Sequence, residues 1–279
     1  MIIPENLTDF LYWVRERTEN LWSSEGWLEH EFYGAKWQPL TETQIDEVEQ
    51  KYGVKFNNEH KEFLKILHAI DKKEIIEYED ENDKVIFEEH TWFYNWLINE
   101  EEIKERLHGL SDWFYSDIEG LNHVWLKSWG KKPSSKEERE NIFQEWFSKI
   151  PQLLPIFGHR FVVGDDNLKW KPIISSWGSD IIVMGWDFRT YLLNEIRSHL
   201  DIYEDVFDEE DQMFYPEILP AVQEIFDENF KYNETKDIPY LKEMILYWSS
   251  GWSSFGMKYH PKGTKVHPIV KTFTAEKEN

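Results

Sequence analysis

The first periodic pattern in the chain is helical. Between residues 7 and 21 the apolar side chains fall three or four positions apart, at Leu7, Phe10, Leu11, Val14 and Leu21. Spacing of this kind places apolar side chains on one face of a helix. We therefore expect an amphipathic helix over residues 7–21.

The next two helices are predicted from their ends. Thr41 and Gln44 have the spacing of a capping box, in which each side chain bonds the backbone N–H of the other residue, and Gly53 is placed to end the helix that follows. A further helix is expected to begin with Asn57 or Asn58 as its cap and to run to about Ile70. The two would form a short helical hairpin.

The period then changes to that of strands. Residues 75–78 and 85–87 are β-branched and aromatic and flank a polar loop, which predicts a β-hairpin with its turn around Asn82-Asp83. The pattern from residue 93 to residue 129 is mostly helical. After a loop rich in Gly, Pro and Ser, another helix is expected over residues 136–150, capped by Ser134 or Ser135.

Four short β-branched runs give the clearest prediction of a sheet. Each run is bounded by Gly, Asp or Asn, and the connections between them are short, so we expect antiparallel strands. The runs are residues 153–157, 160–163, 172–175 and 180–184. Asp187 is then expected to cap a helix that reaches Ile196.

Together these patterns predict an α+β fold: a twisted, mainly antiparallel sheet with helices packed on it and helical extensions at both ends. We expect residues 1–200 to form the main domain. Residues 201–279 are expected to form an acidic, mainly helical extension that ends in a basic tail and packs on the same domain.

Composition narrows the possible functions. The 279 residues include no cysteine, which excludes disulfides, a thiolate nucleophile and a cysteine-ligated zinc site. The N-terminus has no features of a secretory signal, and no apolar run approaches the roughly 20 residues of a membrane span. We expect a cytoplasmic protein without a cofactor.

The charge of the chain narrows the class of partner. The formal net charge is −23, and 16% of the residues are aromatic, including 15 Trp. Binding to nucleic acid or an anionic membrane requires Lys and Arg, so neither is an expected partner. A basic protein is the expected partner, and a monomer is the expected state of the chain itself.

Two stretches of the sequence resemble a known family. The first carries Trp37, Pro39, Thr41, Ile45, Glu49, Gly53, Phe56, Phe63 and Leu64. The second is the run Pro155-Ile156-Phe157-Gly158-His159-Arg160-Phe161, followed by the strands up to Gly185. Together they resemble the SMI1/KNR4 family of the SUKH superfamily, in its long bacterial form, over residues 37–196. The sequence departs from the family pattern at Asn57, where proline is usual, and at residues 68–71, where Asn-Gly-Gly is usual.

The resemblance implies an α+β domain without catalytic activity. Many bacterial members of the family are immunity proteins that neutralise a cognate toxin, frequently a nuclease, whereas fungal members are signalling scaffolds. We therefore expect an immunity protein that blocks the basic active cleft of a toxin with an acidic surface. The alternative is a regulatory or scaffold module that binds another cytosolic protein.

The acidic surface is expected in the segment from Asp201 to Glu228, which holds eleven acids and no Lys or Arg. One interpretation is a solvated loop and helix face that keeps the protein in solution. The other is a contact surface, because acids alternate there with aromatic side chains. The predicted partner-binding residues are Glu204, Asp205, Phe207, Asp208, Glu209, Glu210, Asp211, Phe214 and Tyr215.

A second candidate site combines His159 and Arg160 with Asp165 and Asp166. An imidazole beside an arginine could act as a general base on an anion, but without an accompanying Ser or Cys nucleophile motif the pattern favours a histidine held by backbone hydrogen bonds at a strand turn. The two aspartates lack the spacing of a calcium loop, which favours a solvated turn. No catalytic residue and no metal site are therefore expected. Six tryptophans could line a sugar or nucleobase site, but their helical spacing favours the core for most of them, and one or two exposed ones would suit a contact surface: Trp92, Trp96, Trp113, Trp125, Trp129 and Trp146.

Overall fold

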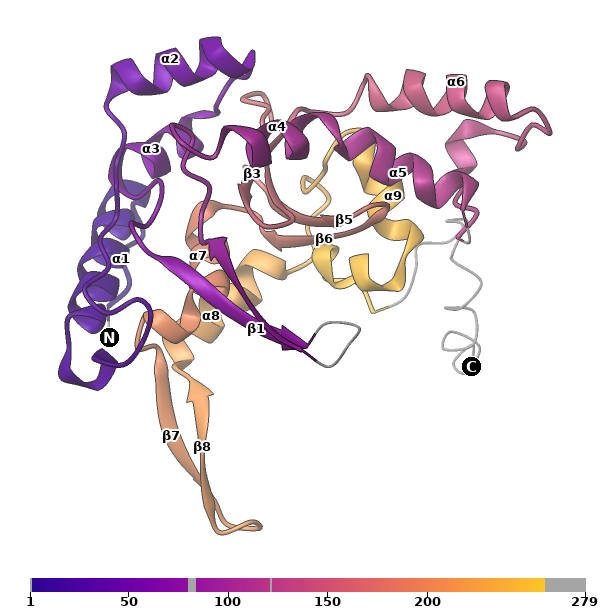
Figure 1. The fold of residues 1–279 in the computed structure, drawn as a ribbon. Coiled ribbons are helices and arrows are strands. Elements are labelled where there is room, and N and C mark those ends of the chain that lie inside the picture. The colour runs from indigo at the N-terminus through magenta and orange to yellow at the C-terminus, as the bar shows by residue number, and fades with distance from the viewer. Residues whose placement is uncertain (1, 80–83, 121, 259–279) are drawn as a thin grey trace.

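The structure is a computed structural model that describes residues 2–79, 84–120 and 122–258. Helices pack against antiparallel strands in an α+β arrangement (Figure 1). The predicted fold class is confirmed. None of the helices in the described part of the chain has the length and apolar character that crossing a membrane requires.

Three helices and a 3-10 turn precede the first strand. They are α1 (Leu7–Trp22), η1 (Glu25–Trp27), α2 (Glu42–Tyr52) and α3 (Asn58–Ile66). The capping box of Thr41 and Gln44 forms at the start of α2, and Gly53 ends this helix in the left-handed conformation at φ 64°. Asn57 caps α3 by accepting the backbone N–H of His60. These boundaries follow from the local sequence, as predicted.

The middle of the chain forms a hairpin and then a helical layer. The hairpin consists of β1 (Lys73–Glu79) and β2 (Val85–Thr91). The helical layer consists of α4 (Glu100–His108), α5 (Leu110–Glu119), η2 (Lys127–Trp129) and α6 (Lys136–Phe147). Ser135 caps α6, as predicted. The turn expected at Asn82-Asp83 lies outside the described residues.

A four-stranded antiparallel sheet follows, with its strands in chain order. Its strands are β3 (Leu153–Phe157), β4 (Arg160–Val163), β5 (Ile173–Trp177) and β6 (Asp180–Gly185). All four predicted strands are confirmed to within two residues. Short turns join β3 to β4 and β5 to β6, whereas residues 164–172 form a longer loop between β4 and β5. The pairing places Phe161 opposite Ile174 and Ser175 opposite Ile182.

The two faces of this sheet bury different cores. Because side chains alternate along a strand, Leu154 and Val162 enter a first cluster while Leu153 and Val163 enter a second. The first cluster includes side chains of α1, α2 and α3, and the second includes side chains of α5 and α6. Burial of both faces explains why the strands are continuous apolar runs.

The C-terminal part adds to both clusters. Its elements are α7 (Phe188–Glu195), η3 (Arg197–His199), β7 (Tyr203–Asp208), β8 (Met213–Ile218), α8 (Pro220–Phe230), α9 (Leu241–Tyr247), η4 (Ser249–Gly251) and η5 (Ser253–Phe255). Asp187 caps α7 by accepting the backbone N–H of Thr190 at 2.7 Å. Leu241, Met244 and Ile245 of α9 are fully buried in the second cluster.

Two helices end earlier than the sequence suggested. α3 stops at Ile66 rather than Ile70, because His68 takes a left-handed conformation with φ 65°. Its ring Nε2 accepts the backbone N–H of Trp96, and its Nδ1 lies 2.8 Å from the carbonyl oxygen of Gln38. A tertiary contact thus breaks the helix. α6 ends at Phe147 rather than Ile150.

The acidic segment differs more from expectation. The sequence predicts a mainly helical extension from residue 201 onward, whereas residues 203–218 form the β7–β8 hairpin. Val206, Phe207, Phe214 and Tyr215 are residues with high strand propensity. Their pairing across a short turn outweighs the acids between them.

Candidate functional site

The β7–β8 hairpin projects from the body of the protein (Figure 1). Its strands pair from Tyr203 opposite Ile218 to Asp208 opposite Met213. Within the described residues, neither strand pairs with any other strand. Both edges of the hairpin therefore present unpaired backbone groups to solvent.

One face of the hairpin carries a pair of phenylalanines. Phe207 and Phe214 lie directly opposite each other, with ring centroids 5.1 Å apart, and they are 44% and 65% exposed. The opposite face carries Val206, Met213 and Tyr215, which are also exposed. Apolar side chains thus face solvent on both sides, an arrangement typical of a contact surface.

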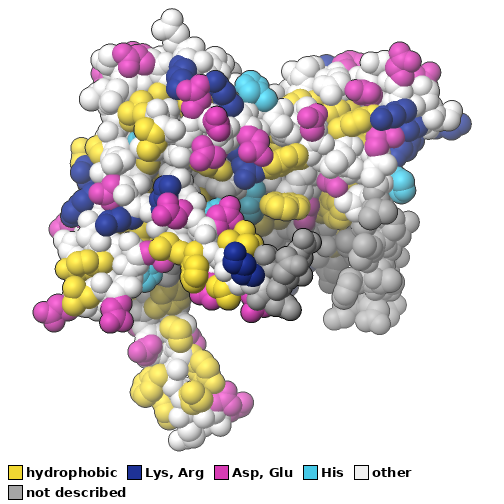
Figure 2. Space-filling view, in the orientation of Figure 1, with side chains coloured by type: hydrophobic (Ala, Val, Ile, Leu, Met, Phe, Trp, Pro, Cys, Tyr) yellow, Lys and Arg dark blue, Asp and Glu magenta, His cyan; other side chains and the backbone are white. Residues whose placement is uncertain are grey.

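Seven carboxylates lie between and beside these apolar side chains. They belong to Glu204, Asp205, Asp208, Glu209, Glu210, Asp211 and Glu217. In the part of the chain that the structure describes, none of them forms an ion pair with Lys or Arg. Figure 2 shows acidic and hydrophobic side chains together on the projection. The hairpin therefore holds a concentrated negative potential.

The tip of the hairpin is ordered by its own side chains. Asp208 Oδ1 accepts the backbone N–H groups of Glu210 at 2.7 Å and Asp211 at 3.0 Å. The hydroxyl of Tyr215 donates to Asp211 Oδ2 at 3.0 Å. These bonds fix the turn although like charges crowd it.

The base of the hairpin is anchored in the first core cluster. Tyr203 and Ile218 pack partly buried against that cluster. Arg17 of α1 donates from Nε to the carbonyl oxygen of Leu200 at 2.8 Å, and its Nη2 pairs with Asp201 at 3.2 Å. The direction of the hairpin is therefore set where it leaves the body.

A buried histidine lies just before this base. Trp22 Nε1 donates to His199 Nδ1 at 3.0 Å, and the ring of Trp92 lies 4.6 Å from that of His199. Burial, together with the nearby His30, lowers the pKa of His199 to about 4. His199 is therefore neutral at pH 7, as its role as hydrogen-bond acceptor requires.

The contact between Trp92 and His199 also links the β1–β2 hairpin to the β7–β8 hairpin. Trp92 directly follows β2, and His199 lies four residues before β7. The β1–β2 hairpin also exposes apolar side chains, namely Ile75, Ile76, Tyr78, Val85 and Phe87. The end of the β1–β2 hairpin and the start of the β7–β8 hairpin therefore adjoin the same aromatic cluster.

The second predicted site is divided by the structure. His159 lies in the turn between β3 and β4, and Arg160 begins β4. Arg160 pairs with Glu195 at 2.9 Å, donates to Ser175 Oγ at 3.0 Å and contacts His159 Nε2. Burial, Arg160 and Arg106 lower the pKa of His159. Arg160 therefore has a structural role, in an ion pair with Glu195.

Asp165 and Asp166 lie beyond the opposite end of β4. Asp166 Oδ1 accepts the backbone N–H of Asn58 at 3.2 Å, and Asp165 Oδ1 accepts that of Asn167 at 2.8 Å. Lys171 closes the loop by donating to the carbonyl oxygen of Asp166 at 2.8 Å. The structure therefore does not bring these aspartates together with His159 and Arg160.

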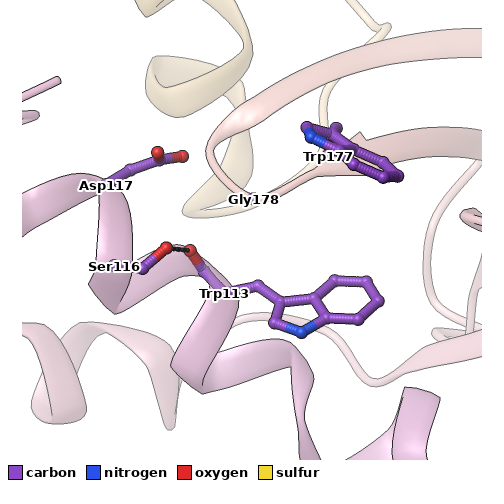
Figure 3. Close-up of a pocket in the computed structure, with 5 residues that line it drawn as sticks. All are labelled: Trp113, Ser116, Asp117, Trp177 and Gly178. Carbon is purple, nitrogen blue, oxygen red and sulfur yellow. Dashed lines mark hydrogen bonds between the residues drawn. The ribbon is translucent and has the colours of Figure 1, made fainter. Parts of the chain in front are cut away.

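A pocket that the sequence did not reveal lies between α5 and the β5–β6 turn (Figure 3). It is lined by Trp113, Ser116, Asp117, Trp177 and Gly178. Trp113 was expected in the core but is only partly buried, and Trp177 is 71% exposed. The available signal was the position of Trp177, next to a glycine turn at the end of a strand.

Neither metal-binding residues nor comparison with known proteins adds to the description of the candidate site. Among the described residues, no three His, Cys, Asp or Glu side chains are grouped so that they could hold a metal ion. No protein family model, curated protein or solved structure matches the chain.

Proposed function

We propose that this chain is a non-catalytic binding protein that holds a basic protein partner on its β7–β8 hairpin. The observation that carries the proposal is a projecting hairpin with exposed apolar side chains on both faces and seven carboxylates, none of which forms an ion pair with a described Lys or Arg.

Binding would proceed in two stages. The negative potential of the hairpin attracts a cationic surface from a distance and accelerates the encounter. Phe207 and Phe214 then anchor the partner, because exposed aromatic side chains provide large contact areas at low entropic cost. The open strand edges offer further backbone hydrogen bonds.

The shape of the hairpin favours a concave partner. A narrow projection enters a cleft, and its carboxylates would occupy the positions that nucleic-acid phosphates take in the active cleft of a nuclease. The likeness of residues 37–196 to the SMI1/KNR4 family supports this immunity role. We therefore propose a toxin, with a basic cleft that the hairpin occludes, as the partner.

The proposal is tested by capture from a lysate of the source organism at low salt. The baits are the natural chain, a Phe207→Ser/Phe214→Ser variant and a matched control, Phe87→Ser. Phe87 lies on the other hairpin and is 66% exposed, close to the 65% of Phe214. We expect the natural chain and the control to retain one basic protein that elutes as ionic strength rises. The double variant should retain none.

Three results would contradict the proposal. The first is an acidic partner, the second is equal capture by the double variant, and the third is equal loss of capture with Phe87→Ser. A circular dichroism spectrum of each bait establishes that loss of capture is not loss of folding. Inhibition of a captured nuclease by the natural chain, but not by the double variant, tests the immunity role directly.

A further inference from the structure

The pocket beside Trp177 is small and has a well-defined lining. It measures about 300 Å³, and Figure 3 shows its two indole rings on opposite sides, Trp113 from α5 and Trp177 from the end of β5. Ligand pockets generally range from about 300 to 1,000 Å³, so this one suits a single side chain or ring.

A carboxylate is fixed at the wall of the pocket. Asp117 Oδ2 accepts the backbone N–H of Ser179 at 2.8 Å and its hydroxyl at 2.7 Å, and Oδ1 accepts from Asn122 at 2.7 Å. The turn approaches so closely that a Cβ on Gly178 would lie 2.5 Å from Asp117 Oδ2. The position of the carboxylate is therefore set before any ligand arrives.

The chemistry of the lining indicates a planar cation. The faces of indole rings attract positive charge, and a carboxylate beside them adds to that attraction. A phosphate-bearing ring is disfavoured by the net charge of −23. A guanidinium group satisfies both features, because it is flat enough to stack on indole and pairs with carboxylates.

An internal contact demonstrates the same chemistry. The guanidinium carbon of Arg106 lies 4.7 Å from the centroid of the Trp113 ring. On the other side, the ring of His159 lies 5.6 Å from that of Trp177, and the lowered pKa of His159 keeps it neutral at pH 7. The charge of Arg160 is paired with Glu195.

We infer that the pocket formed by Trp113, Trp177 and Asp117 binds the guanidinium group of an arginine side chain. This inference rests on the proposed function, since a basic protein partner supplies such a side chain. The pocket would then be a second contact, separate from the β7–β8 hairpin.

Binding is measured by NMR on the full ¹⁵N-labelled chain, through the indole N–H signals assigned with Trp113→Phe and Trp177→Phe. The probes are N-acetyl-arginine methylamide, the corresponding lysine amide, adenosine monophosphate and methyl glucoside. We expect the arginine amide to shift both indole signals saturably. Trp177→Ala should raise its Kd about tenfold, whereas the exposed aromatic control Tyr12→Ala should leave it unchanged.

Arg106 distinguishes a cationic from an anionic ligand. Arg106→Gln removes a like charge beside the pocket, so the Kd of the arginine amide should fall about threefold. A rise in that Kd would overturn the inference. So would equal binding of the lysine amide, binding of the nucleotide or the glucoside in place of arginine, or no shift with any probe.

The two proposals fail separately. If the arginine amide leaves the indole signals unchanged while capture still depends on Phe207 and Phe214, the pocket assignment is wrong and the hairpin assignment stands. If the amide binds but capture does not depend on the hairpin, the proposed function is wrong.

Discussion

Glu59 and His60 are neighbours in the first turn of α3, and burial moves their pKa values in opposite directions. Burial and the carboxylate of Asp187 raise the pKa of Glu59 to about 7. Burial and His68 lower the pKa of His60 to about 3. Both shifts disfavour the charged form, because this turn packs against α7 and leaves little room for water. The two residues therefore make the free energy of unfolding depend on pH in two different pH ranges.

Glu59→Gln is expected to stabilise the protein above neutral pH. The pKa of Glu59 is higher in the folded than in the unfolded state, so its contribution is complete below about pH 4.5 and is lost as the pH rises to about 7. Glutamine remains neutral throughout. Urea unfolding should give a variant that is more stable by about 3 kcal/mol at pH 8 and nearly equal at pH 4.5. A constant difference at both pH values would contradict the assigned shift.

His60→Phe is expected to have its largest effect in acid. The pKa of His60 is lower in the folded state, so its contribution is complete above about pH 6.5 and is lost as the pH falls towards 3. Both ring nitrogens are buried among Phe56, Phe63 and Phe188 and have no hydrogen-bond partner among the described residues. Between pH 7.5 and pH 5 the variant should lose about 2 kcal/mol less of its unfolding free energy than the natural chain. Parallel pH profiles would refute this.

Glu195→Gln should destabilise the fold strongly. The side chains of Glu195 and Arg160 are only 9% and 17% exposed, so removing one charge leaves the other buried and unpaired. We expect the free energy of unfolding to fall by about 3 kcal/mol. Glu228→Gln is the control, because its ion pair with Lys231 is at least 70% exposed on both sides. Equal effects of the two substitutions would count against the buried pair.

Gly185→Ala should be among the most damaging small changes. A Cβ at Gly185 would lie 2.5 Å from the backbone nitrogen of Tyr191, where β6 packs on the start of α7. We expect a loss of at least about 2 kcal/mol in unfolding free energy, because both partners are backbone and neither can turn away. Gly26→Ala is the control, since a Cβ there meets nothing within 4 Å. A thermal melt that does not separate the two variants would contradict the packing.

The sequence predicted those elements whose causes are local. The capping box of Thr41 and Gln44 acts within one helical turn, and Asp187 caps α7 in the same way. The strands β3 to β6 follow from β-branched runs bounded by Gly, Asp or Asn. In each of these cases neighbouring residues decide the structure, so a linear pattern was sufficient.

What the sequence did not predict depends on distant contacts. α3 ends early because His68 bonds with Gln38 and Trp96, which lie about 30 residues away on either side. The pocket requires α5 to meet the β5–β6 turn through Asp117 and Ser179. The acidic residues were recognised as a candidate surface, but their strand pairing was hidden by the low strand propensity of aspartate and glutamate.

The open edges of the β7–β8 hairpin also bear on how the protein behaves in isolation. Outer strand edges that pair with no other described strand, beside exposed Phe207 and Phe214, are templates for pairing between identical molecules. Mutual repulsion of the seven carboxylates opposes that pairing at neutral pH, as gatekeeper charges do beside other apolar strands. Replacing these carboxylates with amides would remove the repulsion and leave the apolar ladder in place. Concentrated solutions of such a variant should therefore oligomerise and precipitate, whereas the natural chain stays dispersed.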